Sequence, residues 1–165
     1  MRRKDREITD FAAIEAILKR GTACQLALCD GDMPYVVTLN YGYEDRCIYL
    51  HGALEGKKLD ILQRNPNVCL TVVGAATLDL QENGVSSTTY YESVVGFGRG
   101  EILTDAGEKC HGLGVLMAHL GMPIDVAMLT DAAVAKTAVV RVRLTEITGK
   151  RHPHPEQATR TDGND

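Results

Sequence analysis

Short turns between strand-like segments constrain this chain most. Residues 23–28 and 35–43 are rich in apolar, β-branched and aromatic side chains, and residues 30–34 between them, Asp-Gly-Asp-Met-Pro, are typical of a turn. A second turn at 44–46 leads into a further strand at 47–51. Turns this short join antiparallel neighbours, because a parallel pair needs a crossover of a dozen or more residues. The sequence therefore predicts an antiparallel sheet and argues against a parallel dinucleotide-binding fold.

Helices and further strands complete this pattern. Thr9 or Asp10 is expected to cap a helix that starts at Phe11, and Gly21 is expected to end it in a left-handed conformation. Apolar spacing predicts further helices at 55–64 and about 105–120, short helical pieces between 124 and 136, and strands at 68–73, 88–103 and 137–147. Residues 74–87 are expected to be a loop or an irregular strand extension. The fold class is α+β, mainly β: a small barrel of about six antiparallel strands with peripheral helices.

Length and charge limit the classes of function. The 165 residues correspond to about one domain, expected at 1–149, followed by a mobile polar C-terminal tail at 150–165. The 18 basic and 22 acidic residues give a net charge of −4, so we expect no nucleic acid as the main partner. No apolar run approaches the ~20 residues that span a bilayer, and no signal peptide is recognisable. We therefore expect a cytoplasmic protein without a membrane partner, and its five cysteines as reduced thiols.

Two further sequence features are not assigned a site. Gly96, Gly98 and Gly100 imitate a phosphate loop, but they fall inside a predicted strand, where a bulge or a close approach of backbones explains them better. The remaining histidines, at 111, 119, 152 and 154, are expected to be solvated or at the edge of the core. No metal site is therefore predicted.

The segment from His51 to Lys58 is the strongest candidate for a binding site. A strand ends at His51, and the small residues Gly52 and Ala53 allow a ligand to approach the backbone. Lys57 and Lys58 then open a helix, whose free amides and dipole favour an anion. A phosphate group is the expected occupant; solvated surface lysines are the alternative that these residues leave open.

A series of short motifs runs along residues 1–149: Met1-Arg2-Arg3-Lys4, Leu26-Ala27-Leu28, Asp30-Gly31, Pro34-Tyr35-Val36-Val37, Leu39-Asn40-Tyr41, Tyr49-Leu50-His51-Gly52-Ala53, Gly56-Lys57-Lys58, Asn65-Pro66 before Val68, and Tyr91-Glu92-Ser93-Val94-Val95-Gly96-Phe97-Gly98. Taken in order, these motifs resemble the flavin-binding split-barrel superfamily of pyridoxamine 5′-phosphate oxidase, and most closely its 5-nitroimidazole-resistance (Nim) branch.

The resemblance implies a homodimer with FMN in two clefts at the subunit interface. The residues that it places around the cofactor are Val37, Thr38, Leu39 and Asn40 along the flavin ring, His51, Gly52 and Ala53 near it, Lys57 and Lys58 on the phosphate, and Ser93 and Val94 on the strand that closes the cleft. Thr38 departs from the family, which more often has Pro there, and Nim-type proteins often have His at the place of Lys57.

The function implied is that of an FMN-dependent oxidoreductase that reduces a small-molecule acceptor such as a nitroaromatic compound. His51 is the candidate catalytic residue, with a structural histidine bonded to backbone as the alternative. Two other functions stay open: pyridoxamine 5′-phosphate oxidase itself, for which the arginine and histidine set of the second phosphate is not recognisable, and a non-catalytic flavin-binding module.

Overall fold

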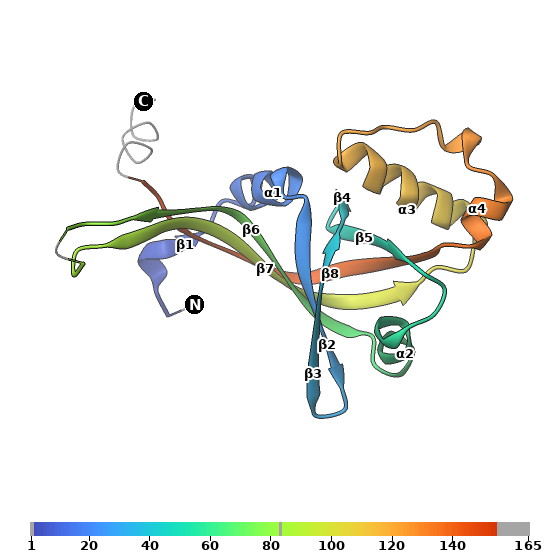
Figure 1. The fold of residues 1–165 in the computed structure, drawn as a ribbon, viewed down its shortest axis with the longest axis horizontal. Helices are drawn as coiled ribbons and strands as arrows, with labels where there is room; N and C mark the ends of the chain where they lie inside the picture. Colours follow the sequence, from blue (N-terminus) through green and yellow to red (C-terminus); the bar gives the residue numbers. More distant parts are fainter. Residues whose placement is uncertain (1, 83, 155–165) are drawn as a thin grey trace. The chain divides into compact units, whose positions relative to one another are not determined.

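Eight strands and four α-helices form the parts of the chain that this computed structural model describes, residues 2–82 and 84–154 (Figure 1). The strands are β1 (Glu7–Ile8), β2 (Ala23–Asp30), β3 (Met33–Asn40), β4 (Gly42–Glu44), β5 (Cys47–Gly52), β6 (Asn67–Asp79), β7 (Thr88–Ile102) and β8 (Ala138–His152). The helices are α1 (Phe11–Arg20), α2 (Lys57–Arg64), α3 (Ala106–His119) and α4 (Asp131–Ala135), with short 3₁₀ segments η1 (Lys4–Arg6) and η2 (Val126–Met128).

The strands join in one sheet in the order β3-β2-β6-β7-β8-β5-β4, with β1 paired to β8. The β2–β3 and β4–β5 hairpins are antiparallel, which confirms the prediction from the short turns. Gly31, at a φ of +63°, supplies the left-handed residue of the first turn. The strand predicted at 35–43 is two strands, because the chain leaves β2 after Asn40 and pairs with β5 from Gly42 onward.

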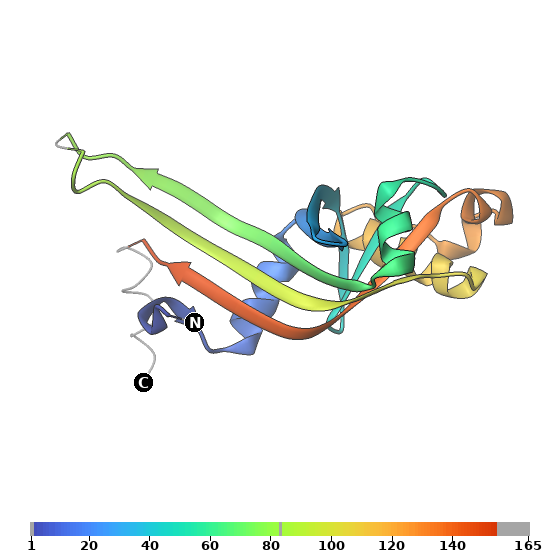
Figure 2. The same cartoon turned by 90° about the horizontal axis from the view of Figure 1, so that it is seen from below.

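The chain divides into two compact units. The first unit comprises the described parts of 1–21, 72–94 and 148–165, and the second unit comprises 22–71 and 95–147. Strands β6, β7 and β8 each have residues in both units and are long and continuous (Figure 2). Strand β8 continues to His152, past residue 150, where the mobile tail was expected to start; residues 155–165 of that expected tail lie outside the described residues.

Alternation along the strands places the core of the second unit. In β2, Leu26 and Leu28 are almost completely buried, whereas the residues between them are partly exposed. Helix α2 turns Leu59 and Leu62, three positions apart, towards this core. The helix ends at Arg64, as predicted, because Asn65 precedes a proline and adopts an extended conformation.

Glycines let the backbones of the second unit approach closely. A Cβ atom at Gly42 would lie 2.5 Å from the Cα of Leu116, so α3 packs directly against β4. On β7, a Cβ atom at Gly98 would overlap the backbone carbonyl of Arg143 on β8. The close approach of backbones expected for the strand glycines is therefore present at Gly98, whereas Gly96 and Gly100 face side chains; all three lie inside β7, as predicted.

Helix α1 organises the first unit. Asp10 accepts a hydrogen bond from the amide of Ala12 at 3.0 Å and caps the helix, as predicted. Ile14 lies against Gly149 and Ile17 against Gly74. The left-handed cap expected at Gly21 is wrong: its φ is −67°, since the chain continues directly into the extended conformation of β2.

All five cysteines are free thiols. Within the described residues, none of the helices combines the length and the apolar character needed to cross a membrane.

Candidate functional site

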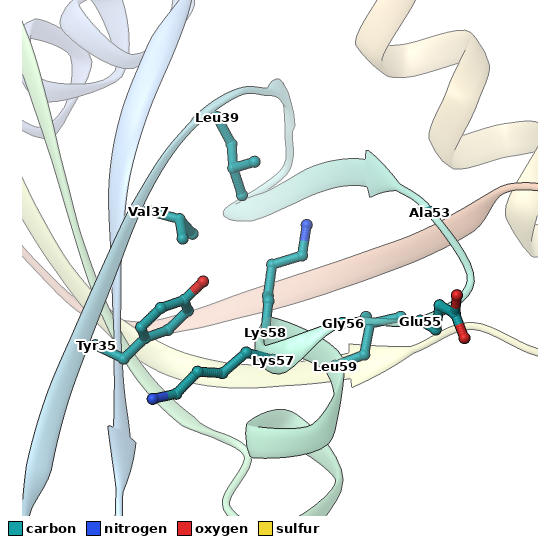
Figure 3. Close-up of a pocket in the computed structure, with 9 residues that line it drawn as sticks. All are labelled: Tyr35, Val37, Leu39, Ala53, Glu55, Gly56, Lys57, Lys58 and Leu59. Atoms are coloured by element: carbon teal, nitrogen blue, oxygen red, sulfur yellow. The ribbon is translucent and has the colours of Figure 1, made fainter.

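A pocket of about 220 Å³ lies in the second unit, between β3 and the segment that leads into α2 (Figure 3). Its lining residues are Tyr35, Val37, Leu39, Ala53, Glu55, Gly56, Lys57, Lys58 and Leu59. The segment predicted as the strongest binding site therefore meets the strand predicted to line a cofactor. Five of the predicted residues lie together here: Val37, Leu39, Ala53, Lys57 and Lys58.

Strand β3 forms the apolar wall of the pocket. Tyr35, Val37 and Leu39 occupy alternate positions and are partly buried, so they share the face that looks into the pocket. Thr38 and Asn40 occupy the opposite, exposed face, and the side-chain amide of Asn40 donates to the backbone carbonyl of Thr22 at 2.9 Å. Of the four β3 residues predicted around the cofactor, two line the pocket with their side chains and two do not.

Gly56 shapes the polar end of the pocket. Its φ of +129° and ψ of +161° lie in a region that only glycine occupies without strain. From this position its carbonyl accepts hydrogen bonds from the amides of Leu59 and Asp60 and so starts α2. The first amides of the helix, at Lys57 and Lys58, then have no partner within the helix. Donors and the positive end of the helix dipole therefore meet at the pocket.

Lys58 places a cation inside the pocket. Its side chain is half-buried and extends towards the side where Val37 and Leu39 lie (Figure 3). Its ammonium lies beside Gly52, 3.2 Å from where a Cβ atom would stand on that glycine. No carboxylate among residues 2–82 and 84–154 forms an ion pair with it. Burial lowers the pKa of Lys58, and the neighbouring Cys24 partly offsets this effect.

Lys57 is held differently. Its ammonium lies 3.4 Å from a carboxylate oxygen of Asp30 and 5.1 Å from the centre of the Tyr35 ring. The side chain extends along Tyr35, at the rim of the pocket (Figure 3). The two lysines that the sequence treats as equivalent therefore differ: Lys57 shares its charge with a carboxylate, whereas Lys58 forms no ion pair within the described part of the chain.

The remaining predicted residues lie outside the pocket lining. Because Gly52 faces Lys58, the neighbouring His51 on β5 points to the other face of the strand. The imidazole of His51 is exposed and has no hydrogen-bond partner in the described parts of the chain. The hydrogen bond to the backbone that a purely structural His51 would make is therefore not observed there. Ser93 and Val94 lie on β7 in the first unit, and their place in a cofactor cleft stays a prediction.

Sequence reasoning missed four residues of the pocket: Tyr35, Glu55, Gly56 and Leu59. Tyr35 could have been found, because it has the same parity as Val37 and Leu39 along a predicted strand. Gly56 lies next to the predicted lysines, but only its being a glycine hints at its positive φ, and nothing else in the sequence indicates it. Glu55 has no recognisable signal at all.

Comparisons with known proteins match this fold over most of the chain. The family model described as pyridoxamine 5′-phosphate oxidase matches residues 10–151. A proposed 5-nitroimidazole antibiotic resistance protein from Bacteroides thetaiotaomicron has a similar structure, with 36% identity, a TM-score of 0.78, and coverage of 88% of this chain and 86% of that one.

More distant structures share the fold. A flavocytochrome from Azotobacter vinelandii has a TM-score of 0.79 at 21% identity, covering 94% of this chain and 73% of that one. An FAD- and heme-binding protein from Mycobacterium smegmatis has a TM-score of 0.78 at 17% identity, covering 97% and 81%.

Among curated sequences, an uncharacterized protein from Rhizobium meliloti is 29% identical over 97 residues, which is 59% of this chain and only 56% of that relative. The family match over residues 10–151 agrees with the antiparallel α+β fold and with the short motifs along the sequence. The chain belongs to the pyridoxamine 5′-phosphate oxidase-like family and has its split-barrel fold.

Proposed function

We propose that this protein is an FMN-binding oxidoreductase that reduces small nitroaromatic or related acceptors. The observation that carries the proposal is the ammonium of Lys58, which is half-buried in a pocket and has no carboxylate partner among the described residues. A buried charge without a partner is unfavourable, so such a site favours an anionic ligand. A phosphate group beside Lys58 and the first amides of α2 satisfies this requirement.

The residues of the pocket fit a flavin mononucleotide. Lys58 and the amides at the start of α2 would hold the phosphate, and Tyr35, Val37 and Leu39 supply an apolar wall suited to a ring system. When bound, the cofactor supplies the hydride and electron transfer. The chain's own contribution is to bind and orient the cofactor, to keep water from the apolar wall, and to place positive charge at the phosphate end.

Comparisons support the cofactor class and the type of acceptor. The Azotobacter flavocytochrome and the Mycobacterium FAD- and heme-binding protein indicate that this fold accommodates flavins. The Bacteroides protein, proposed to act in 5-nitroimidazole resistance, is 36% identical to this chain. A nitro compound is therefore the acceptor to test first.

A homodimer is part of the proposal. The pocket's 220 Å³ is smaller than the roughly 300–1,000 Å³ of ordinary cofactor pockets, so a second subunit is expected to complete it. Strand β3 also exposes two large apolar side chains, Met33 at 67% and Val36 at 56%. Light scattering should give twice the chain mass of 17.9 kDa, and a flavin-loaded monomer would contradict this part of the proposal.

Reoxidation of the reduced, FMN-loaded protein tests the activity. We expect rapid reoxidation by a 5-nitroimidazole under anaerobic conditions. If the loaded protein instead oxidises pyridoxamine 5′-phosphate with oxygen, the acceptor assignment is wrong and the activity is that of pyridoxamine 5′-phosphate oxidase. Turnover of neither would make the protein a non-catalytic flavin-binding module.

A further inference from the structure

The carboxylate of Asp30 lies between two cations of α2. One of its oxygens accepts a hydrogen bond from Arg64 at 2.7 Å, and the other lies 3.4 Å from the ammonium of Lys57. Asp30 is the last residue of β2, at the turn into β3. Lys57 and Arg64 are the first and last residues of α2, seven positions apart, and therefore lie on the same face of the helix.

The two ion pairs are unequal. Arg64 makes the shorter contact with Asp30, whereas the longer contact of Lys57 is shared with the ring of Tyr35. Lys57 is also a lining residue of the pocket, and its side chain is 57% exposed. Its ammonium therefore stands at the rim, held by Asp30 but on a flexible stem that can turn towards an anion in the pocket.

We propose that Asp30 is a positioning residue that sets the affinity of the pocket for phosphate by holding Lys57 at the rim. This inference rests on the proposed function, because it concerns the same phosphate end of the pocket. When a phosphate binds beside Lys58, Lys57 exchanges the carboxylate of Asp30 for the phosphate. Arg64 makes the exchange possible, since it leaves Asp30 paired after Lys57 has moved.

One physical argument supports this arrangement. Ion pairs between exposed side chains contribute little net stability, so Lys57 can leave Asp30 at small cost. As long as the pair exists, however, a phosphate has to compete with the carboxylate of Asp30 for the ammonium of Lys57. Removal of Asp30 should therefore strengthen phosphate binding, whereas removal of Arg64 should weaken it, because Asp30 would then hold Lys57 alone.

The test compares FMN with riboflavin, which has the same ring system without the phosphate. Dissociation constants of the full-length protein are measured by flavin fluorescence at one fixed ionic strength. Asp30→Asn should tighten FMN about three- to fivefold, and Arg64→Gln should weaken it by about threefold, while riboflavin changes less than about twofold in both. In the double variant Asp30→Asn with Lys57→Met, FMN affinity should equal that of Lys57→Met alone.

Asp32→Asn is the matched control. It removes the same charge from the same turn, and Asp32 makes no ion pair with any residue in the described ranges. FMN affinity of this variant should stay within twofold of that of the wild type. An equal gain from Asp32→Asn and Asp30→Asn would overturn the specific role of Asp30.

Other outcomes also overturn the inference. If Asp30→Asn weakens the binding of FMN and riboflavin equally and lowers the melting temperature, Asp30 only stabilises the packing of the β2–β3 hairpin against α2. If the gain persists without Lys57, no exchange of partners occurs. The proposed function fails separately, if the wild-type protein binds FMN no better than riboflavin and Lys58→Met changes neither.

Discussion

Replacement of Lys58 by Met should weaken the binding of FMN without destabilising the folded protein. Methionine has a similar length and suits the apolar wall, but it carries no charge. It therefore removes an ammonium that has no carboxylate partner among the described residues. Charge-assisted hydrogen bonds contribute about 1.5–3 kcal/mol, so FMN should bind about 10- to 150-fold more weakly. Riboflavin, which lacks the phosphate, should bind as before.

The same substitution should raise the free energy of unfolding, whereas most substitutions lower it by about 1 kcal/mol. Burial lowers the pKa of Lys58 from its ordinary 10.5, so the unfolded chain binds this proton more tightly than the folded one. In wild type, this group therefore makes stability rise with pH, between its folded pKa and 10.5. The Met variant should lack that rise.

Urea unfolding followed by circular dichroism at neutral and alkaline pH measures both effects, together with flavin fluorescence titrations. Lys136→Met, a change of the same type at an exposed lysine, serves as the control and should alter neither property. The reasoning is refuted if Lys58→Met leaves FMN affinity unchanged, or if it destabilises the protein at every pH.

Three further predictions concern single residues around the pocket and in the sheet. Gly52→Ala places a methyl group 3.2 Å from the ammonium of Lys58, so it should weaken FMN binding while urea unfolding changes by no more than about 0.5 kcal/mol; unaltered affinity would place the phosphate elsewhere. Gly98→Ala forces a Cβ atom against the backbone of Arg143 and should destabilise by about 1–3 kcal/mol, more than Gly96→Ala, which meets only the side chain of Leu144; the reverse order in urea unfolding would disprove this packing. His51→Ala should leave stability and FMN binding intact, because its ring is exposed and has no hydrogen-bond partner in the described residues; slower single-turnover reoxidation by a nitro compound would support a catalytic role, and equal rates would exclude it.

Much of the fold follows from local patterns in the sequence. The turn at Gly31 and the alternation in β2 predict the first hairpin, and Asn65-Pro66 predicts where α2 ends, because each signal acts within a few residues. The change of partner at Tyr41 was not predictable, because it depends on which strand lies beside each half of the segment. Strand β6 continues to Asp79, which agrees with the strand extension that was one of the two interpretations of residues 74–87.

The candidate site was predictable at the level of its segments. Small residues followed by two lysines at a helix start indicate an anion site from chemistry alone. Lys57 differs from Lys58 because its ammonium pairs with Asp30, which lies 27 positions earlier in the chain. Asp30 is close to Lys57 because it stands at the end of β2, where the chain turns into β3. Side-chain direction on β5 likewise decides that Gly52, and not His51, faces Lys58.

Identification of the ligand that the purified protein carries tests the central claim most directly. The absorption spectrum of the protein, as isolated and after incubation with FMN and gel filtration, should show a bound flavin, and mass spectrometry of the released ligand should give the mass of FMN. Loss of that flavin in Lys58→Met, with retention in Lys136→Met, would tie it to the pocket between β3 and α2. A wild-type protein that retains no flavin after incubation with FMN would contradict the account.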